Sequence, residues 1–145
     1  MLDATRTING SFGEVHDADG NWLTNVTNFE ANVEINKEEI ARSGTRWIGH
    51  KATSLTGTGT LSGYKVTTEL IEKVSQIKDD RQGMFVTELV GKLADPESFG
   101  AMRVRLKNVQ FDEIPLIDFE TNSLVEEELP FTFSDYEFLD TIEAD

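Results

Sequence analysis

The side chains with which this chain could do chemistry are carboxylates and two histidines, since cysteine is absent. His16 and His50 lie far apart, and neither has a second ligand at the spacing of a metal site. No serine lies in a G-x-S-x-G nucleophile motif. The glycine-rich run from Gly57 to Gly63 has its last glycine one residue late for the dinucleotide pattern and lacks a P-loop Lys-Ser pair. The sequence therefore predicts no catalytic residue, no metal and no cofactor.

The charged residues are distributed unevenly along the chain. Of the 145 residues, 27 are acidic and 13 basic, for a net charge of −14. Residues 112–145 contain 12 of the acids, among them Glu126, Glu127 and Glu128, and no Lys, Arg or His. Direct binding to nucleic acid phosphates is disfavoured, because it depends on Lys and Arg. The acidic quarter is a solubilising face, one half of a complementary interface or a repulsive lining.

Length and composition predict a single domain over residues 1–145. No apolar run approaches the roughly 18 residues that a membrane span needs. The N-terminus has no cationic start followed by an apolar block, so we expect neither a signal peptide nor a membrane anchor. A product made in the cytoplasm is the default, and release inside a particle would leave the same features.

Strand patterns dominate the sequence. Residues 29–35 alternate apolar and polar side chains, which predicts a half-buried strand. Residues 56–64 alternate Thr and Ser with small residues, so both faces of that strand are small and we expect another backbone to approach closely. Further strands are predicted at residues 11–22, 84–93, 101–111 and 125–134.

Several residues predict turns and irregularities between and within these strands. Asp19-Gly20 is typical of a tight hairpin turn. Residues 95–98 read as a turn, because Pro96 fixes φ and Asp95 can bond its own following backbone. A shift in the apolar phase predicts a bulge or bend near Asn108. Pro130 cannot donate to a ladder, which predicts a sheet edge or an irregularity.

One helix is predicted, over residues 67–79, with Thr67 as its N-cap. Its apolar side comprises Leu70, Ile71, Val74 and Ile77. Trp22 and Trp47 are expected as core or interface anchors. The chain therefore reads as one antiparallel β domain with one helix packed across it.

Residues 36–52 are predicted as a locally basic loop between the two clearest strands. This loop is longer than the two to five residues typical of hairpins. One hypothesis pairs it with the acidic quarter of a neighbouring copy, a head-to-tail contact that closes into a ring when its rotation divides a full turn. The alternative is that the loop folds back on its own domain.

Four segments, in the same order, resemble the tail tube proteins of contractile phage tails and phage-like particles, the PBSX-type, XkdM-like family. They are residues 28–40, 46–53, 56–67 and 126–138. The resemblance spans about residues 9–138, and its specificity comes from order and combined length, because no single motif is diagnostic.

The resemblance implies a β-sandwich or small barrel with a flanking helix, similar to the tubes of type VI secretion systems. It implies hexameric rings that stack into a tube with a negatively charged lumen, in a virion or phage-tail-like particle. The implied partners are further copies of the chain, a sheath protein, and baseplate or initiator and terminator proteins. DNA would meet the lumen only in transit, and a headless bacteriocin that passes no DNA fits equally.

The resemblance also suggests roles for particular residues. The expected lumen-lining residues are Glu30, Asn32, Glu34, Thr56, Thr58 and Thr60. The expected inter-subunit or ring-stacking residues are Arg42, Arg46, Trp47, His50, Lys51, Glu126, Glu127 and Glu128. The helix would lie outside, covering the barrel.

Two competing interpretations remain open at this point. A small monomeric β-rich module would bind a sugar or peptide and use Trp22 or Trp47 as an exposed platform. A hydrolase with an unrecognised carboxylate pair is a more distant alternative. Self-assembly separates the tube interpretation from both.

Overall fold

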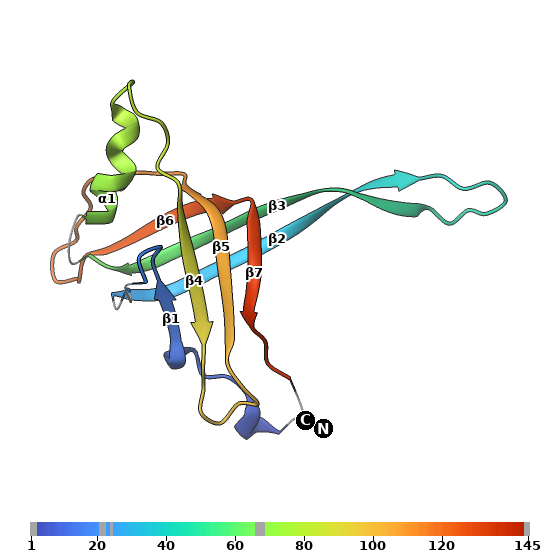
Figure 1. Cartoon of the computed structure of the whole chain (residues 1–145), viewed down its shortest axis with the longest axis horizontal. Coiled ribbons are helices and arrows are strands. Elements are labelled where there is room, and N and C mark those ends of the chain that lie inside the picture. The colour runs from blue at the N-terminus through green and yellow to red at the C-terminus, as the bar shows by residue number, and fades with distance from the viewer. Residues whose placement is uncertain (1–2, 21–22, 24, 66–68, 144–145) are drawn as a thin grey trace.

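The computed structural model describes residues 3–20, 23, 25–65 and 69–143. Seven antiparallel strands pair in these parts of the chain in the order β1-β4-β5-β6-β3-β2, with β7 also paired to β5. The strands are β1 (Gly13–His16), β2 (Val26–Ile40), β3 (Gly49–Tyr64), β4 (Thr87–Leu93), β5 (Met102–Phe111), β6 (Glu126–Phe133) and β7 (Asp135–Asp140). Strands β2, β3 and β6 follow the long axis of the molecule, whereas β1, β4, β5 and β7 run across it (Figure 1). The result is an antiparallel sandwich with steeply crossed layers, as expected.

Strand β5 joins the two layers. Its first part pairs with β4 and β7, and its last residues, Gln110 and Phe111, pair with β6. Between these parts Asn108 has φ +57°, a left-handed conformation that asparagine tolerates better than most residues. The predicted bend near Asn108 is confirmed, and it lets one strand turn the corner between crossed layers.

The core lies between the layers and is centred on Phe131, which is 1% exposed. Its ring stacks on Phe29 at 5.9 Å between centroids and meets the edge of Phe111 at 6.1 Å. The buried apolar cluster consists of Val15, Leu61, Val74, Leu89, Leu106, Val109, Phe111, Leu129, Phe131 and Phe133. Almost every strand contributes, so the core ties distant parts of the sequence together.

The helical segment is shorter and less regular than predicted. Helix α1 covers Glu69–Val74 and continues as a 3₁₀ turn over Ser75–Lys78, while the expected cap Thr67 lies outside the described residues. Val74 is buried as predicted, but Ile77 is 46% exposed. The prediction for Ile77 was wrong, because three residues per turn in a 3₁₀ turn change the face on which the next apolar residue falls. The segment covers one end of the sandwich (Figure 1).

The N-terminal region also differs from its prediction. Two short 3₁₀ turns, Ala4–Arg6 and Gly10–Phe12, precede β1. Within the segment expected as strand over residues 11–22, the described strand is therefore Gly13–His16, and residues 21 and 22 lie outside the described residues. Strand β1 pairs with β4. The turn at Gly20 is confirmed by its φ of +85° and by its N–H, which donates to the Asp17 carbonyl oxygen at 3.1 Å.

Pro130 lies where the pairing between β5 and β6 ends. Its carbonyl oxygen accepts from the Asp112 N–H at 2.8 Å. In an antiparallel strand the nitrogen and the carbonyl oxygen of a residue point to the same side, so the Pro130 ring nitrogen also faces β5, just past the two residues that pair β5 with β6. Of the predicted edge or irregularity, the edge is confirmed on the β5 side, where that ladder ends, while the register with β3 runs through Pro130 without a shift. Two other strand bounds are corrected: β4 begins at Thr87 rather than at residue 84, and β7 was not predicted as a separate strand.

The prediction of a loop over residues 36–52 was wrong in extent. Strand β2 continues to Ile40 and β3 begins at Gly49, so only residues 41–48 connect them. The outer halves of β2 and β3 form a two-stranded arm, residues 35–55, that projects from the body (Figure 1). A register shift at Asn36/Lys37 marks its base. The arm does not fold back on its own domain.

Candidate functional site

A polar sheet face brings together the six residues predicted to line a lumen. Glu30 lies opposite Thr60 and Asn32 opposite Thr58. Glu34 lies opposite Thr56 in the same ladder. Directly opposed residues of an antiparallel pair point to the same side of the sheet, so all six share one face. We call this surface of β2, β3 and β6 the polar face.

Strand β6 extends the polar face and adds to its charge. Glu128 lies opposite Ser62 and Glu126 opposite Tyr64, so both carboxylates join the same surface. The three strand segments, residues 26–36, 53–64 and 126–133, contain no Lys, Arg or His. Four glutamates therefore share the polar face without a basic residue between them: Glu30, Glu34, Glu126 and Glu128.

Hydrogen bonds between side chains order part of the polar face. The Asn32 side-chain amide donates to Glu30 Oε1 at 2.7 Å. The Asn36 amide donates to the hydroxyls of Ser54 and Thr56, each at 3.0 Å. These bonds fix the positions of polar side chains on neighbouring strands of the polar face.

The opposite side of the same sheet is packed against the core through glycines. A Cβ atom added to Gly59 would lie 2.3 Å from the Glu30 carbonyl oxygen and 2.6 Å from the Phe131 ring. Gly57 has the same relation to Phe133, at 2.6 Å from its carbonyl oxygen. The expected close approach at this strand is confirmed, and it brings the sheet that carries the polar face directly against the core.

The arm presents the basic residues predicted for subunit contacts. Arg42 and Arg46 lie in its tip, and His50 and Lys51 lie in β3 opposite Glu39 and Glu38. All four are exposed. Trp47 is 78% exposed, which excludes the core role that was one of its two predictions. Trp22 lies outside the described residues.

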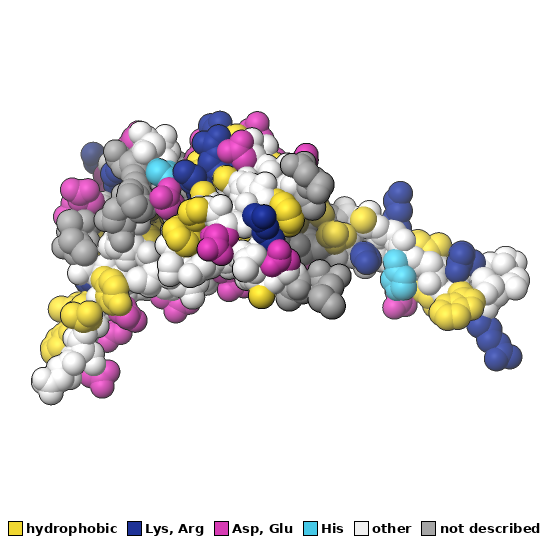
Figure 2. All heavy atoms as spheres, turned by 90° about the horizontal axis from the view of Figure 1, so that it is seen from below, with side chains coloured by type: hydrophobic (Ala, Val, Ile, Leu, Met, Phe, Trp, Pro, Cys, Tyr) yellow, Lys and Arg dark blue, Asp and Glu magenta, His cyan; other side chains and the backbone are white. Residues whose placement is uncertain are grey.

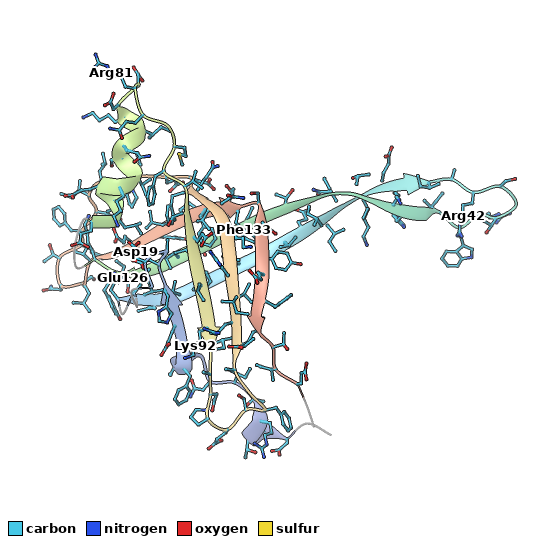
Figure 3. The ribbon with its side chains drawn as sticks, in the orientation of Figure 1. Asp19, Arg42, Arg81, Lys92, Glu126 and Phe133 are labelled. Carbon is cyan, nitrogen blue, oxygen red and sulfur yellow. The ribbon has the colours of Figure 1, made fainter. Side chains whose placement is uncertain are left out.

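The structure does not place the three consecutive glutamates on one surface. Glu126 and Glu128 are exposed on the polar face, whereas Glu127 points to the other side and is half-buried. Its Oε2 atom is buried without a hydrogen-bond partner among the described residues. Alternation along a strand separates neighbours in this way. Arg42 and Glu126 lie at opposite ends of the molecule (Figure 3), so any contact between them joins different copies.

In the layer formed by β1, β4, β5 and β7, most charged side chains form ion pairs within the subunit. Arg103 pairs with Asp140, Arg105 with Glu88, and Lys107 with Glu137. These cross-strand pairs are partly exposed, so each stabilises the fold by no more than about 1 kcal/mol. Their consequence is that two acids of the C-terminal quarter already have basic partners within the subunit.

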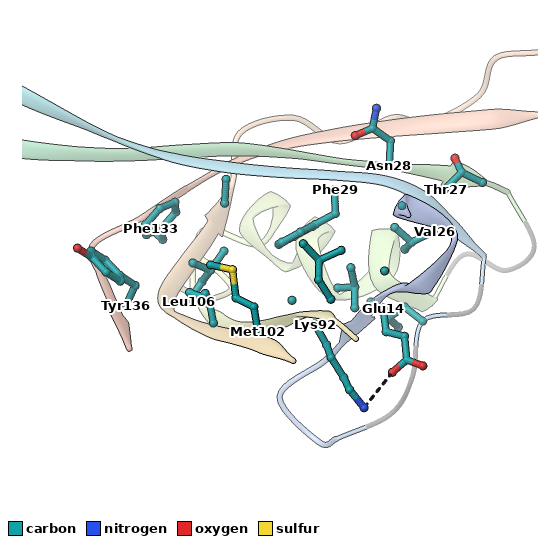
Figure 4. Close-up of a pocket in the computed structure, with 18 of the residues that line it drawn as sticks. Glu14, Val26, Thr27, Asn28, Phe29, Lys92, Met102, Leu106, Phe133 and Tyr136 are labelled. Atoms are coloured by element: carbon teal, nitrogen blue, oxygen red, sulfur yellow. Dashed lines mark ion pairs between the residues drawn. The ribbon is translucent and has the colours of Figure 1, made fainter. Parts of the chain in front are cut away.

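A cleft of about 970 Å³ opens between the layers (Figure 4). Its walls are mainly apolar, with Phe29, Leu106 and Phe133 among them, and an ion pair of 3.8 Å between Glu14 and Lys92 lies at one side. Trp47 does not line the cleft, so it is no platform for a ligand bound there. Among the described residues, no three His, Asp or Glu side chains gather as a metal site.

The fold is shared with chains of contractile injection systems. The chain superposes with a TM-score of 0.72 on a chain of the sheath-tube complex of the PVC extracellular contractile injection system, over 93% of both chains at 13% identity. It superposes with a TM-score of 0.74 on a chain of the anti-feeding prophage tube-terminating cap, over 97% of this chain and 96% of the other at 12% identity.

Sequence comparison then identifies the family. The phage tail tube protein family DUF2001 matches residues 1–140, and the chain belongs to it. The chain is 38% identical to phage-like element PBSX protein XkdM of Bacillus subtilis (strain 168), over 94% of its own length and 92% of the relative. The YqbM protein of the same organism matches equally well.

Membership of this family confirms the tail tube interpretation drawn from the sequence. The chain is a structural subunit of a phage tail or phage-tail-like particle and not an enzyme. The hydrolase and binding-module interpretations are thereby set aside. No helix among the described residues is long and apolar enough to cross a membrane.

Proposed function

We propose that six copies of this chain form a ring, that the rings stack into a tube, and that the polar face of β2, β3 and β6 lines its channel. The observation that carries this proposal is the strand register, which gathers the six predicted lumen residues with Glu126 and Glu128 on one uncovered surface without a basic residue. In a ring, the strands would continue from one copy to the next and enclose a negatively charged lumen.

An acidic lumen suits passage of DNA through the channel. DNA phosphates bind to Lys and Arg, so a wall that carries only carboxylates repels them and leaves no site at which the DNA would stop. The same wall would serve a particle that passes no DNA, because an acidic polar surface is also stable against a channel filled only with water and small ions. DNA therefore contacts this chain only in transit, if it does so at all.

The arm is the proposed contact between subunits or between successive rings. Its backbone is paired only within the hairpin, and the exposed side chains at its tip combine an aromatic ring with two arginines, a composition typical of interface anchors. Arg42, Arg46, Trp47, His50 and Lys51 would meet a neighbouring copy, whereas Glu126 and Glu128, which the sequence grouped with them, would lie on the channel wall and Glu127 points inward.

The further partners follow from the solved relatives. Chains of similar fold occur in a sheath-tube complex, a sheath and tube terminator, and a baseplate. We infer that this chain likewise contacts a sheath protein on the outside of the tube, a terminator at one end and a baseplate or initiator at the other. It would be made in the host cytoplasm and incorporated there into the particle.

The first test is negative-stain electron microscopy of the purified chain at low and moderate salt. Hollow tubes or rings with six-fold averages are expected. Loss of tubes as salt rises would follow from screening of the contacts between arm and acids. Rings of another symmetry would contradict the hexamer, and monomers alone, even when purified baseplate is added as a template, would contradict self-assembly.

The channel assignment can be tested separately, because the chain has no cysteine to interfere with labelling. Thr58→Cys places a thiol on the polar face, and Asp80→Cys places a control thiol beyond the helical segment. A maleimide carrying a polymer too wide for the channel should label Thr58→Cys in dissociated subunits but not in tubes, and Asp80→Cys in both. Equal labelling of Thr58→Cys in tubes and subunits would exclude the polar face from the lumen.

A further inference from the structure

A second exposed apolar surface lies in the connection between β5 and β6, residues 112–125, which we call the acidic loop. Leu116, Ile117, Phe119 and Leu124 of this loop are 74–81% exposed. Only Ile114 packs against the core. Large apolar side chains gathered on a surface mark an interaction site more often than chance exposure, because leaving them in water opposes folding.

The acidic loop has a defined shape despite this exposure. At its start the Asp112 N–H donates to the Pro130 carbonyl oxygen at 2.8 Å. At its end the Val125 carbonyl oxygen accepts from the Lys65 N–H at 2.8 Å. The Lys65 ammonium group also donates to the Leu116 carbonyl oxygen at 3.3 Å. The loop is therefore held from both ends and near its centre while its apolar side chains face solvent.

The acidic loop and the arm tip complement each other in charge and resemble each other in apolar exposure. The loop carries Asp112, Glu113, Asp118 and Glu120 and no basic residue. The tip, residues 41–48, carries Arg42 and Arg46 and no acidic residue, next to Trp47 and Ile48. The two surfaces lie at opposite ends of the long axis (Figure 1), and the space-filling view shows the arm with basic and hydrophobic side chains together (Figure 2).

Other acids of the C-terminal quarter are less available to the arm. Glu137 and Asp140 pair with Lys107 and Arg103 of the same subunit, and Glu127 points inward. The acids of the polar face stand mainly among Thr and Ser side chains, and Tyr64 opposite Glu126 is a single exposed ring rather than an apolar cluster. Only the acidic loop, among the described residues, combines several unshared carboxylates with large exposed apolar side chains.

We propose that the acidic loop binds the arm tip of another copy. Trp47 and Ile48 would pack on the apolar residues of the loop, and Arg42 and Arg46 would face its carboxylates. This inference rests on the proposed tube and names the surface that receives the arm. Two different surfaces meet in such a contact, so it is head-to-tail and every copy both gives an arm and receives one.

Cysteine cross-linking tests the contact, because the wild-type chain has no cysteine. Ser43→Cys marks the exposed tip and Thr121→Cys marks the exposed acidic loop. The full chain with both changes is treated with a short bismaleimide and run on a denaturing gel. Each single variant and the matched pair Ser43→Cys with Asp80→Cys serve as controls. A ladder of multimers is expected only from the tip-and-loop pair, since only a head-to-tail contact links each copy to two others.

The outcomes separate this inference from the proposed function. A ladder in the tip-and-loop variant, absent from the controls, supports the contact whether or not tubes are seen. Tubes without such a ladder would overturn the contact and leave the tube function standing. Monomers with neither ladder nor tubes, even with baseplate as a template, would overturn both.

A charge exchange gives an independent measurement. Arg42→Glu with Arg46→Glu, and separately Asp118→Lys with Glu120→Lys, should each raise the concentration needed for assembly by about ten-fold or more. The four changes are therefore combined in one chain, and an equimolar mixture of the two variants should recover as well, because alternating copies place the reversed arm of one variant on the reversed loop of the other. Assembly restored toward the wild-type concentration is expected, and no recovery would count against this pairing.

Discussion

The inner and outer halves of the β2–β3 hairpin are paired by the same ladder but differ in everything that surrounds them. In the inner half, Phe29 stacks on Phe131 and Gly59 brings the backbone against the core. In the outer half, Ile35, Leu55 and Trp47 are more than half exposed. The inner half is stabilised by its own chain, whereas the outer half keeps apolar side chains that no part of the described chain covers.

The two halves of the hairpin therefore draw their stability from different sources. A two-stranded ribbon alone is marginally stable in water, so the arm depends on the body at its base and on a partner at its tip. Mutations in the inner half should therefore unfold the subunit, whereas mutations in the outer half should spare the fold and stop assembly. The effect of a substitution on subunit stability should therefore decrease from the core and the inner half to the arm.

Removing the central ring should have the largest effect. Phe131→Ala deletes a side chain that is 1% exposed and contacts three other aromatic rings. A loss of about 3–5 kcal/mol in the free energy of unfolding is expected, measured by urea denaturation of the soluble subunit. A loss below about 1 kcal/mol would mean that the crossed layers do not share one core.

A methyl group on the inner half of β3 should come next. Gly59→Ala places Cβ against the Glu30 carbonyl oxygen and the Phe131 ring, and a cost of about 1–3 kcal/mol is expected because backbone must shift. Gly49→Ala, in the outer half of the same strand, is the matched control, since its Cβ finds only ordinary contacts at 3.6 Å and beyond. Thermal unfolding of both variants measures the contrast, and equal destabilisation would contradict it.

A smaller effect is expected at the N-terminal segment. The Asn9 N–H donates to Asp95 at 2.9 Å and, together with the Glu97 N–H, lowers the pKa of the Asp95 carboxyl group. Because the folded-state pKa is lowered, the stabilisation is complete above the ordinary aspartate pKa of about 4 and is lost as the pH falls through the lowered value.

Asp95→Asn should therefore remove this part of the acid dependence. Hydrogen exchange at Asn9 and Ser11, followed from neutral pH to about pH 3, measures it, with Asp79→Asn as a control at another turn aspartate. Unchanged exchange in the Asp95 variant would show that the bond does not hold the segment.

The smallest effect on stability, and the largest on assembly, is expected in the arm. Arg42→Glu with Arg46→Glu should leave the unfolding midpoint of the subunit within error, because both side chains are exposed, but should block tube growth at the concentration at which the wild-type chain just assembles. The matched control reverses two exposed bases beyond helix α1, Lys78→Glu with Arg81→Glu, and should assemble normally. Electron microscopy provides the readout, and normal tubes from the arm variant would exclude the arm as a subunit contact.

Much of the fold could be predicted because its signals are local. Alternation at residues 29–35 required a strand with unlike faces, and the glycines of residues 56–64 required a closely approached one; both are confirmed. The turn at Gly20, the bend at Asn108 and the end of the β5 ladder at Pro130 follow equally from backbone chemistry. These features depend on a residue and its immediate neighbours, so one sequence is enough to find them.

The parts that failed depend on contacts between distant residues. Residues 36–52 contain polar and charged side chains, which suggested a loop, yet cross-strand hydrogen bonds make most of them strand. Leu116 and Phe119 are as apolar as core residues but are exposed. No signal in the sequence distinguished these two residues from core residues. Periodicity shows that one side of an element is more apolar than the other, but not whether another part of the chain covers that side.

The amino-acid sequence alone was enough to predict a β protein with an acidic C-terminal quarter, without a recognisable set of catalytic residues, and similar along most of its length to tail tube proteins. Only the tertiary structure decided which carboxylates share the polar face, that Glu127 points inward, and that the arm tip and the acidic loop stand at opposite ends. The physical reason is that strand order and register, which bring residues from 26 to 133 onto one sheet, arise from packing of the whole core rather than from any local pattern.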